Sequence, residues 1–256
     1  MENIHKPTER VINILNIIAK NSGKLTFSNI SKLLVIPKST LSPILKTLTE
    51  LEVIILDPSS QTYSIGLSSF QIGQAYLENK SGLNIIKSHM RIISEKCNET
   101  CQLGINHNHE VLYLTKVESS HPIKLLSSIG HNLPLYCTAL GRVFLMDYSE
   151  SAIRNLYLKG LEKFTQNTVD NIDDLINIIN ISKKNQFASE FGEVTSDACC
   201  IAVPIYINNN IRGAIGVSLS TIRATEEHIT NIKLLLKEHS SLITKEFEEL
   251  NIKSIV

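Results

Sequence analysis

A run of hydroxyl and ammonium side chains in residues 36–46 (IPKSTLSPILK) has the chemistry needed to contact nucleic acid. Apolar residues recur there every three or four positions and predict an amphipathic helix with a buried stripe of Leu41, Ile44, Leu45, Leu48 and Leu51. The hydrogen-bond donors lie on or beside the opposite face: Lys38, Ser39, Thr40, Ser42 and Lys46. Such groups can donate to base edges and to phosphates, so this face is a candidate reader of the major groove.

Two helices are predicted before this one. Residues 9–20 place Val11, Ile14, Leu15 and Ile18 at helical spacing, and Gly23 ends the pattern. Residues 28–36 predict a short second helix with Ser28 as its N-cap and with Ile30, Leu33 and Leu34 facing inward. Two helices joined by a short turn after a leading helix make a helix-turn-helix. A small helical domain without a nucleic acid partner is the alternative interpretation.

A β-hairpin is predicted directly after the third helix. Residues 54–56 and 62–65 form its arms, and Asp57-Pro58-Ser59-Ser60 form its turn. Three helices followed by a hairpin are the order of a winged helix-turn-helix. The turn holds no Arg or Lys, so its predicted phosphate contacts are neutral: Ser59, Ser60, Gln61 and Thr62.

Pro43 conflicts with a regular third helix, because proline lacks an N–H group and its ring clashes with the carbonyl four residues earlier. The first turn of a helix has no intrahelical use for its N–H groups. If Ser39 or Thr40 caps the helix, Pro43 falls in or next to that turn. Pro43 then offers a thymine methyl an apolar contact and no hydrogen bond.

Composition and charge bound the remaining possibilities. The chain has 25 basic and 25 acidic residues, but residues 1–75 hold seven basic against five acidic, which places the small basic excess beside the helix-turn-helix. Five cysteines without framework spacing are typical of free thiols in a reducing cytoplasm. With no long apolar run and no signal peptide at the N-terminus, we expect a cytoplasmic protein without a membrane partner.

The second part of the chain mixes strands and helices. Strands are predicted at 101–107, 111–117, 123–129, 201–208 and 213–220, and the last two form a hairpin through residues 208–210. Helices are predicted at 70–79, 83–97, from within 136–147, at 149–159, at 171–185 and over a long C-terminal stretch from residue 226. The fold class is therefore mixed α/β (α+β).

Other chemistries have weaker patterns. His107-Asn108-His109 has an H-x-H spacing and Cys97-x3-Cys101 a pair of thiols, but neither has the further ligands of a metal site. No glycine loop for phosphate is present, so no cofactor is expected. Cys200 with a distant histidine is a candidate nucleophile. A cysteine-dependent enzyme with a helix-turn-helix for partner binding therefore stays as the alternative function.

Several stretches together resemble the IclR family of bacterial transcriptional regulators. They are RVINILNIIAK, FSNISKLLVIPKSTLSPILKTL, TYSIG, IGHNLPLYCTALGRVFL (129–145), FASEFGEVTSDACCIAVPI (187–205) and GAIGVSLS (213–220). The resemblance implies a winged helix over 1–68, a linker helix over 69–82 and a GAF-like effector-binding domain over 83–251. It further implies a homodimer or homotetramer on a pseudo-palindromic DNA operator, gated by a small polar or carboxylate metabolite.

The resemblance also implies an effector site, formed by Thr138, Ala139, Leu140, Glu190, Cys200, Ser218 and Ser220. A helix N-terminus at Thr138 would suit a carboxylate, and Ser218 and Ser220 share one strand face. Of Cys199 and Cys200 only one can line the pocket, and we expect Cys200. The chain departs from the family at Ser42-Pro43, where a polar or basic pair is usual, and at Glu52, where glycine usually ends the recognition helix.

Overall fold

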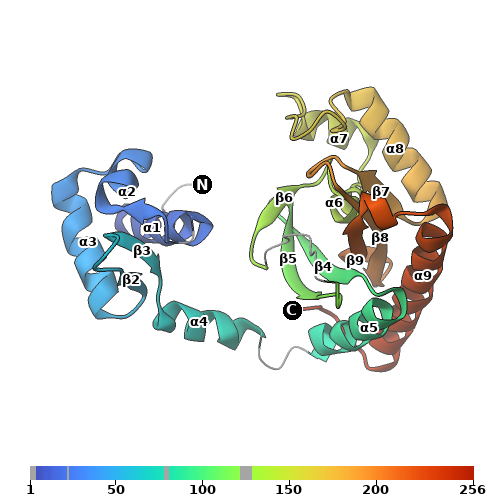
Figure 1. The fold of residues 1–256 in the computed structure, drawn as a ribbon, viewed down its shortest axis with the longest axis horizontal. Helices are drawn as coiled ribbons and strands as arrows, with labels where there is room; N and C mark the ends of the chain where they lie inside the picture. Colours follow the sequence, from blue (N-terminus) through green and yellow to red (C-terminus); the bar gives the residue numbers. More distant parts are fainter. Residues whose placement is uncertain (1–3, 22, 78–80, 122–128) are drawn as a thin grey trace. The chain divides into compact units, whose positions relative to one another are not determined.

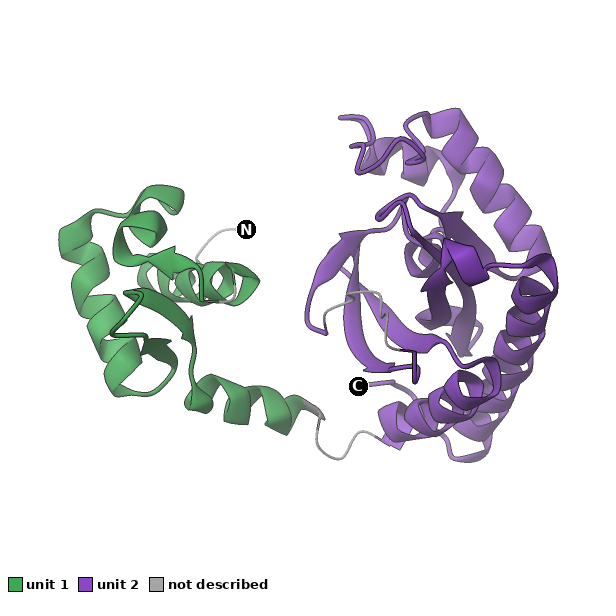
Figure 2. Cartoon of the chain, in the orientation of Figure 1, with its two compact units in different colours: residues 1–79 green, residues 80–256 purple. Residues whose placement is uncertain are grey.

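The computed structural model describes residues 4–21, 23–77, 81–121 and 129–256. These residues form two compact units, 1–79 and 80–256, which are coloured separately in Figure 2. Each unit has its own sheet and its own apolar core. Within the described ranges, no helix is both long and apolar enough to cross a lipid bilayer.

The first unit is a winged helix-turn-helix, as the sequence predicts (Figure 1). Its elements are α1 (Lys6–Asn21), β1 (Leu25–Thr26), α2 (Phe27–Leu33), α3 (Lys38–Glu50), β2 (Ile54–Leu56), β3 (Thr62–Ile65) and α4 (Leu67–Leu77). The strands form an antiparallel sheet in the order β1-β3-β2. Ile14, Ile18, Ile30, Leu41 and Leu45 are buried together in its core, so the predicted apolar stripes do hold α1, α2 and α3 together.

Three details of the helical prediction are wrong. Leu33 and Leu51 were expected inside, but they are 58% and 60% exposed because each lies at the last turn of its helix, past the core contact. Ser28 is not the cap of α2. Thr26 is, since its side chain accepts from the Asn29 backbone N–H while the Asn29 side chain accepts from the Thr26 N–H, a reciprocal capping box.

Glu52 takes the conformation that glycine usually supplies at the end of a recognition helix. Its φ is 55°, in the left-handed region. The Glu52 N–H donates to Thr49 O and the Val53 N–H donates to Leu48 O, which is a Schellman motif. The backbone therefore turns from α3 into the hairpin in the usual way, although position 52 is glutamate and not glycine. The strain of a left-handed side chain is on the order of 1–2 kcal/mol.

The second unit is built on a six-stranded antiparallel sheet in the order β6-β5-β4-β9-β8-β7. Its strands are β4 (Thr100–His107), β5 (Glu110–Val117), β6 (Asn132–Pro134), β7 (Ala188–Phe191), β8 (Ala198–Ile207) and β9 (Asn210–Ser220). Its helices are α5 (Ser81–Cys97), α6 (Ala139–Leu145), α7 (Glu150–Leu156), α8 (Ile172–Asn185) and α9 (Glu226–Glu249), with a 3-10 turn, η1 (Thr221–Arg223).

Helices cover both faces of this sheet (Figure 1). On one face α6 lies across β4 and β9, where the Leu140 side chain approaches Gly104 and Gly216, two positions without side chains. On the other face α5 and α9 pack against each other. The C-terminal Ile255 is buried beside Gly213, so the second unit continues past residue 251.

The predicted strands around β4, β5, β8 and β9 are confirmed, as are the helices that became α4 to α9. Most of the strand expected over 123–129 lies outside the described residues, and Ile129 stands in a turn. The two-residue strand β1 of the first unit was not predicted. Two strands of the second unit were not predicted either, β6 and β7. Both are edge strands of three or four residues, too short for an alternating pattern to be recognised in the sequence.

Candidate DNA interface and effector site

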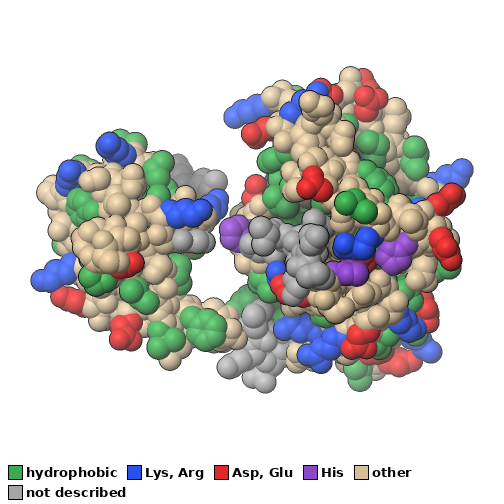
Figure 3. Space-filling view, viewed as in Figure 1, with side chains coloured by type: hydrophobic (Ala, Val, Ile, Leu, Met, Phe, Trp, Pro, Cys, Tyr) green, Lys and Arg blue, Asp and Glu red, His purple; other side chains and the backbone are tan. Residues whose placement is uncertain are grey.

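The exposed face of α3 carries the donors that the sequence predicts. Lys38, Ser39, Ser42, Pro43 and Lys46 are all exposed, whereas Thr40 is half-buried. Lys46 and Glu50, one turn apart, form an ion pair with Nζ 3.8 Å from Oε1. Such an exposed pair contributes little to stability, so the ammonium group can exchange its partner for a phosphate. On the face in Figure 3, the Lys and Arg side chains of the first unit lie apart from one another.

Pro43 lies deeper in α3 than the sequence analysis expected. The helix begins at Lys38, with Pro37 as its N-cap and no side-chain cap from Ser39 or Thr40. The Thr40 and Leu41 N–H groups already donate to Pro37 O. Pro43 is therefore the sixth helical residue, beyond the free first turn. Because proline has no N–H group, the helical hydrogen bond from residue 43 to the carbonyl of the exposed Ser39 is missing.

Replacing Pro43 with alanine is therefore expected to stabilise the first unit by about 1–3 kcal/mol, because alanine restores the missing helical hydrogen bond. The change in the free energy of unfolding is measured by thermal or urea denaturation of the full chain, monitored with a spectroscopic probe attached within residues 1–79. Ser42→Ala is a suitable comparison, because it changes an exposed residue next to Pro43 on the same helix. A Pro43→Ala variant less stable than the wild type would show that the ring packs against something that α3 needs.

The wing turn uses its own hydroxyl groups internally. The Asp57 carboxylate accepts hydrogen bonds from the Ser59 N–H at 2.8 Å, the Ser59 hydroxyl at 2.7 Å and the Ser60 hydroxyl at 2.8 Å. These bonds lower the pKa of Asp57 to about 2, so it stays ionised. The Gln61 amide donates to Pro58 O. The Thr62 hydroxyl lies 2.7 Å from the Ser60 oxygen and donates to it, because the one Ser60 proton goes to Asp57. All four predicted phosphate contacts thus have donors engaged within the turn, and a negative charge stands among them.

Asp57→Asn is expected to raise DNA affinity severalfold for any sequence, because it removes a like charge near the phosphates while keeping an acceptor for Ser59 and Ser60. Fluorescence anisotropy with labelled duplexes at several salt concentrations measures the change. Asp174→Asn makes the same charge change at an exposed position of α8 in the second unit. Equal effects of the two variants would mean that the wing does not approach DNA.

In the second unit, three predicted effector residues form one row across the sheet. Glu190 of β7 pairs directly with Cys200 of β8, and Cys200 pairs with Ser218 of β9. Thr100 of β4 extends the row, since it pairs with Ser218 from the other side. Directly paired residues of an antiparallel sheet project to the same face. A carboxyl, a thiol and two hydroxyl groups therefore line one face, the face that α6 covers.

The predicted helix residues lie on the same side of the sheet, where two of them pack in the apolar core and one caps a helix. Ala139 and Leu140 are buried in one apolar cluster with Cys200, and Cys199 is not part of that cluster. Thr138 is the N-cap of α6: its hydroxyl accepts from the Gly141 N–H at 3.1 Å and donates to Pro134 O at 2.9 Å. Since the Thr138 hydroxyl already donates its proton to β6 and accepts a bond from α6, it has little left to offer an effector.

Ser220, the last predicted effector residue, stands at the end of β9. It pairs with Ala198 and is half-buried, two residue pairs beyond the row of Glu190, Cys200 and Ser218. Ser218 and Ser220 are two residues apart on the strand, so they share a face, as expected from the sequence. Ser220 also begins the turn η1, so it lies at the rim of the polar row.

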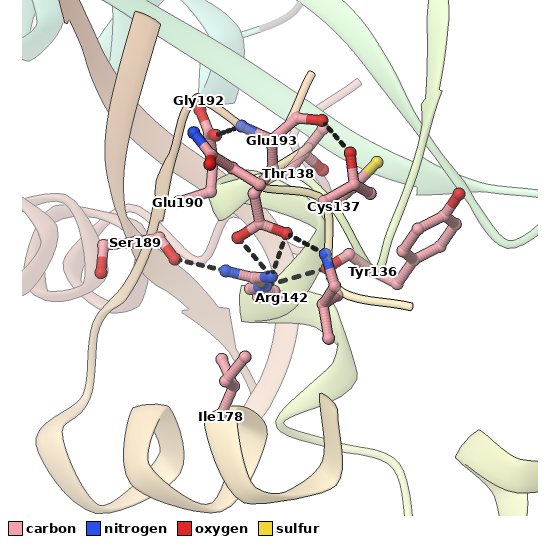
Figure 4. Close-up of polar contacts among 12 residues, drawn as sticks. Tyr136, Cys137, Thr138, Arg142, Ile178, Ser189, Glu190, Gly192 and Glu193 are labelled. Carbon is pink, nitrogen blue, oxygen red and sulfur yellow. Dashed lines mark hydrogen bonds and ion pairs between the residues drawn. The ribbon is translucent and has the colours of Figure 1, made fainter. Parts of the chain in front are cut away.

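A buried arginine, which the sequence analysis missed as a site residue, holds the loop after Glu190 (Figure 4). Arg142 of α6 is 2% exposed. Its Nε donates to Tyr136 O at 2.8 Å, its Nη1 to Ser189 O at 2.7 Å, and its Nη2 lies 2.7 Å from the Glu193 carboxylate. The Glu193 N–H in turn donates to Glu190 Oε2 at 3.0 Å. Arg142 therefore positions Glu190 through Glu193.

The row is weakly acidic and its thiol is unreactive. Burial raises the pKa of the Glu190 carboxyl to about 7, although the hydrogen bond from the Glu193 N–H opposes this. Burial also raises the pKa of the Cys200 thiol well above its usual range, with the charge of Glu190 adding to the effect. A thiol held neutral is a poor nucleophile, which disfavours the enzyme alternative. Among the described residues, no cluster of three or more His, Cys, Asp or Glu could hold a metal ion.

The fold and the two sites define a class: a winged helix-turn-helix DNA-binding protein whose second unit is an α/β domain with a row of polar side chains on one sheet face. Two family models match the chain, the IclR helix-turn-helix domain over residues 7–57 and the bacterial transcriptional regulator IclR C-terminal domain over residues 74–245. The second match alone covers more than half of the chain. The chain therefore belongs to the IclR family of bacterial transcriptional regulators.

Individual relatives agree with this assignment. The chain is 26% identical to the HTH-type transcriptional repressor AllR of Escherichia coli over 90% of this chain and 86% of the relative. It is 27% identical to the HTH-type transcriptional regulator XynR of the same species over 92% and 94%. An IclR regulator structure from Alicyclobacillus acidocaldarius matches with a TM-score of 0.85 at 19% identity, over 95% of this chain and 99% of that chain. The relatives are regulators, so the enzyme alternative is not supported.

Proposed function

We propose that this regulator binds a pseudo-palindromic operator as a homodimer or homotetramer, in the cytoplasm, and that a small polar metabolite in the second unit changes that binding. The row of Glu190, Cys200 and Ser218 carries the proposal, because a carboxyl, a thiol and a hydroxyl group on one sheet face can together hydrogen-bond a small polar molecule. A structural relative from Microbacterium hydrocarbonoxydans, matching with a TM-score of 0.78, is an IclR homologue complexed with 4-hydroxybenzoate.

The chemistry of the row restricts the effector. Glu190 accepts a hydrogen bond when ionised and donates one when protonated, while the Ser218 hydroxyl does either. The basic side chain that lowers the pKa of Glu190 is the buried Arg142, and it is already paired with Glu193. A carboxylate effector therefore binds beside a protonated Glu190. Beside an ionised Glu190, it needs a hydroxyl group of its own that separates its carboxylate from the Glu190 carboxylate. Small hydroxy acids and neutral polar metabolites satisfy this condition.

The affinity for a carboxylate effector is expected to fall as pH rises from 6 to 8, because the pKa of Glu190 is near 7 and its ionisation then places like charges together. Glu190→Gln should flatten the dependence while keeping a hydrogen-bonding side chain. Titration calorimetry at several pH values, with an effector found by screening, measures it. An unchanged pH dependence in Glu190→Gln would remove the carboxyl group from the effector site.

A thermal-shift screen of small metabolites tests the site itself. Binding to the folded state raises the melting temperature by mass action. We expect hits with the wild type that are lost in a Cys200→Leu, Ser218→Ala double variant. They should be kept in Ser241→Ala, which removes an exposed hydroxyl from α9. The same shifts in the double variant would place the effector elsewhere in the second unit.

The oligomeric state is tested separately, because the modest charge of one winged helix makes two half-sites necessary for occupancy. Light scattering after size exclusion, with and without operator DNA, should give two or four chains. Half-sites one helical turn apart, about 10 base pairs, are the expected footprint. A monomer on a single half-site would contradict this part of the proposal.

A further inference from the structure

A pair of buried histidines joins α5 to α9 on the face of the sheet opposite the effector row. His89 of α5 and His239 of α9 are 6% and 3% exposed. Their Nδ1 atoms lie 2.7 Å apart, and their rings meet edge to face. His89 Nε2 lies 2.9 Å from Glu246 Oε1, one further contact to α9. The two helices are thus joined by a chain of three titratable side chains.

The geometry restricts where protons can sit. A hydrogen bond between two Nδ1 atoms needs a proton on one of them and a lone pair on the other. If Glu246 is ionised, His89 carries its proton on Nε2, so in the neutral pair His239 must donate through Nδ1. His239 Nε2 is then a bare lone pair, which agrees with its having no partner among the described residues.

The His89–His239 hydrogen bond can persist when the pair gains one proton relative to two neutral rings, but not when it gains two. A doubly protonated His89 donates to both Glu246 and His239, with the His239 proton moved to Nε2. Protonation of the second ring would set two N–H groups against each other at 2.7 Å. The charged groups that act on His239 besides His89 are Glu238 of α9 and Lys96 of α5. Burial and His89 together lower the pKa of His239 in the folded protein.

We propose that this histidine pair is a proton-sensitive clasp, which holds α5 on α9 when it carries at most one extra proton and opens when it must take up two. An unfolded or opened segment binds a proton on each imidazole below a pKa near 6.5. Because the open state then binds more protons than the closed state, closure is favoured above pH 6.5 and is weakened as pH falls below it. Acidification therefore loosens α5, the first helix after the linker.

Hydrogen exchange of the full chain, followed by mass spectrometry and corrected for the intrinsic pH dependence of exchange, tests the clasp. Peptides from α5 and α9 should show an open population that rises roughly tenfold between pH 6 and pH 5. The reason is that the open state binds about one proton more than the closed state. Peptides from α8 should not share this rise. A His89→Leu, His239→Leu double variant should lose the steep dependence, whereas His107→Asn, an exposed histidine on β4, should keep it.

A second variant keeps the test decisive if the double variant does not fold. Glu246→Gln preserves a hydrogen-bond acceptor for His89 but removes the charge that favours the first extra proton. The closed state then holds fewer protons, so the pH dependence of α5 and α9 exchange should become steeper. A flat pH profile in the wild type, or an unchanged profile in both the double variant and Glu246→Gln, would overturn the clasp.

Discussion

Arg142→Met is expected to destabilise the second unit by about 3–5 kcal/mol, because it removes one partner of a buried ion pair and leaves the other charge unpaired. The guanidinium group is almost fully buried and also donates to Tyr136 O and Ser189 O, so three acceptors lose their donor together. The loss in the free energy of unfolding is measured by denaturation monitored with a spectroscopic probe attached within residues 80–256. Effector binding should weaken further, because the loop that holds Glu190 loses its anchor.

Arg154→Met is the matched control for this prediction. Arg154 pairs with Asp173 between α7 and α8, but both side chains are about half exposed. An exposed pair contributes about 0–1 kcal/mol, so this variant should be close to the wild type. Equal losses in the two variants would mean that Arg142 does not hold a buried charge in solution.

The second large effect is expected from Lys38→Ala combined with Lys46→Ala, which should weaken DNA binding by roughly 100-fold for specific and unspecific sequences alike. Both ammonium groups are exposed on α3, and the wing supplies no positive charge of its own. Anisotropy over a range of salt concentrations should also show a shallower salt dependence, by about two per protomer if each lysine contacts a phosphate.

Lys183→Ala with Lys184→Ala gives the control, since it removes two exposed charges from α8 of the second unit. That variant should bind DNA nearly as the wild type does. If the α3 variant kept its affinity while the α8 variant lost it, the helix-turn-helix would not be the DNA contact.

Local patterns in the sequence are sufficient to predict the helices and the longer strands of this fold. The stripe through Leu41 and Leu45 predicts α3 because helical periodicity depends on residues three and four apart. The two-residue period of strands likewise predicts that Ser218 and Ser220 share a face. These features follow from the backbone geometry of a single element, so no contact between distant residues is needed to predict them.

The features that were missed depend on contacts between side chains. Arg142 and Glu193 are separated by 51 residues, and nothing in either stretch alone shows that they pair. The wing was predicted correctly as a hairpin, but Asp57 takes up the hydroxyl groups of Ser59 and Ser60, a local Asx-type arrangement that competes with phosphate binding. The start of α3 was misplaced because Pro37, not a side-chain cap, begins the helix.

A genomic binding selection with the full-length protein tests the central claim most directly. Fragmented DNA from the host is incubated with the protein, and bound fragments are sequenced, with the Lys38→Ala, Lys46→Ala variant as the background. We predict enrichment of a pseudo-palindromic sequence whose half-sites are one helical turn apart, absent from the variant. A wild-type selection that enriches no sequence above that background would contradict the account of this chain as a sequence-specific regulator.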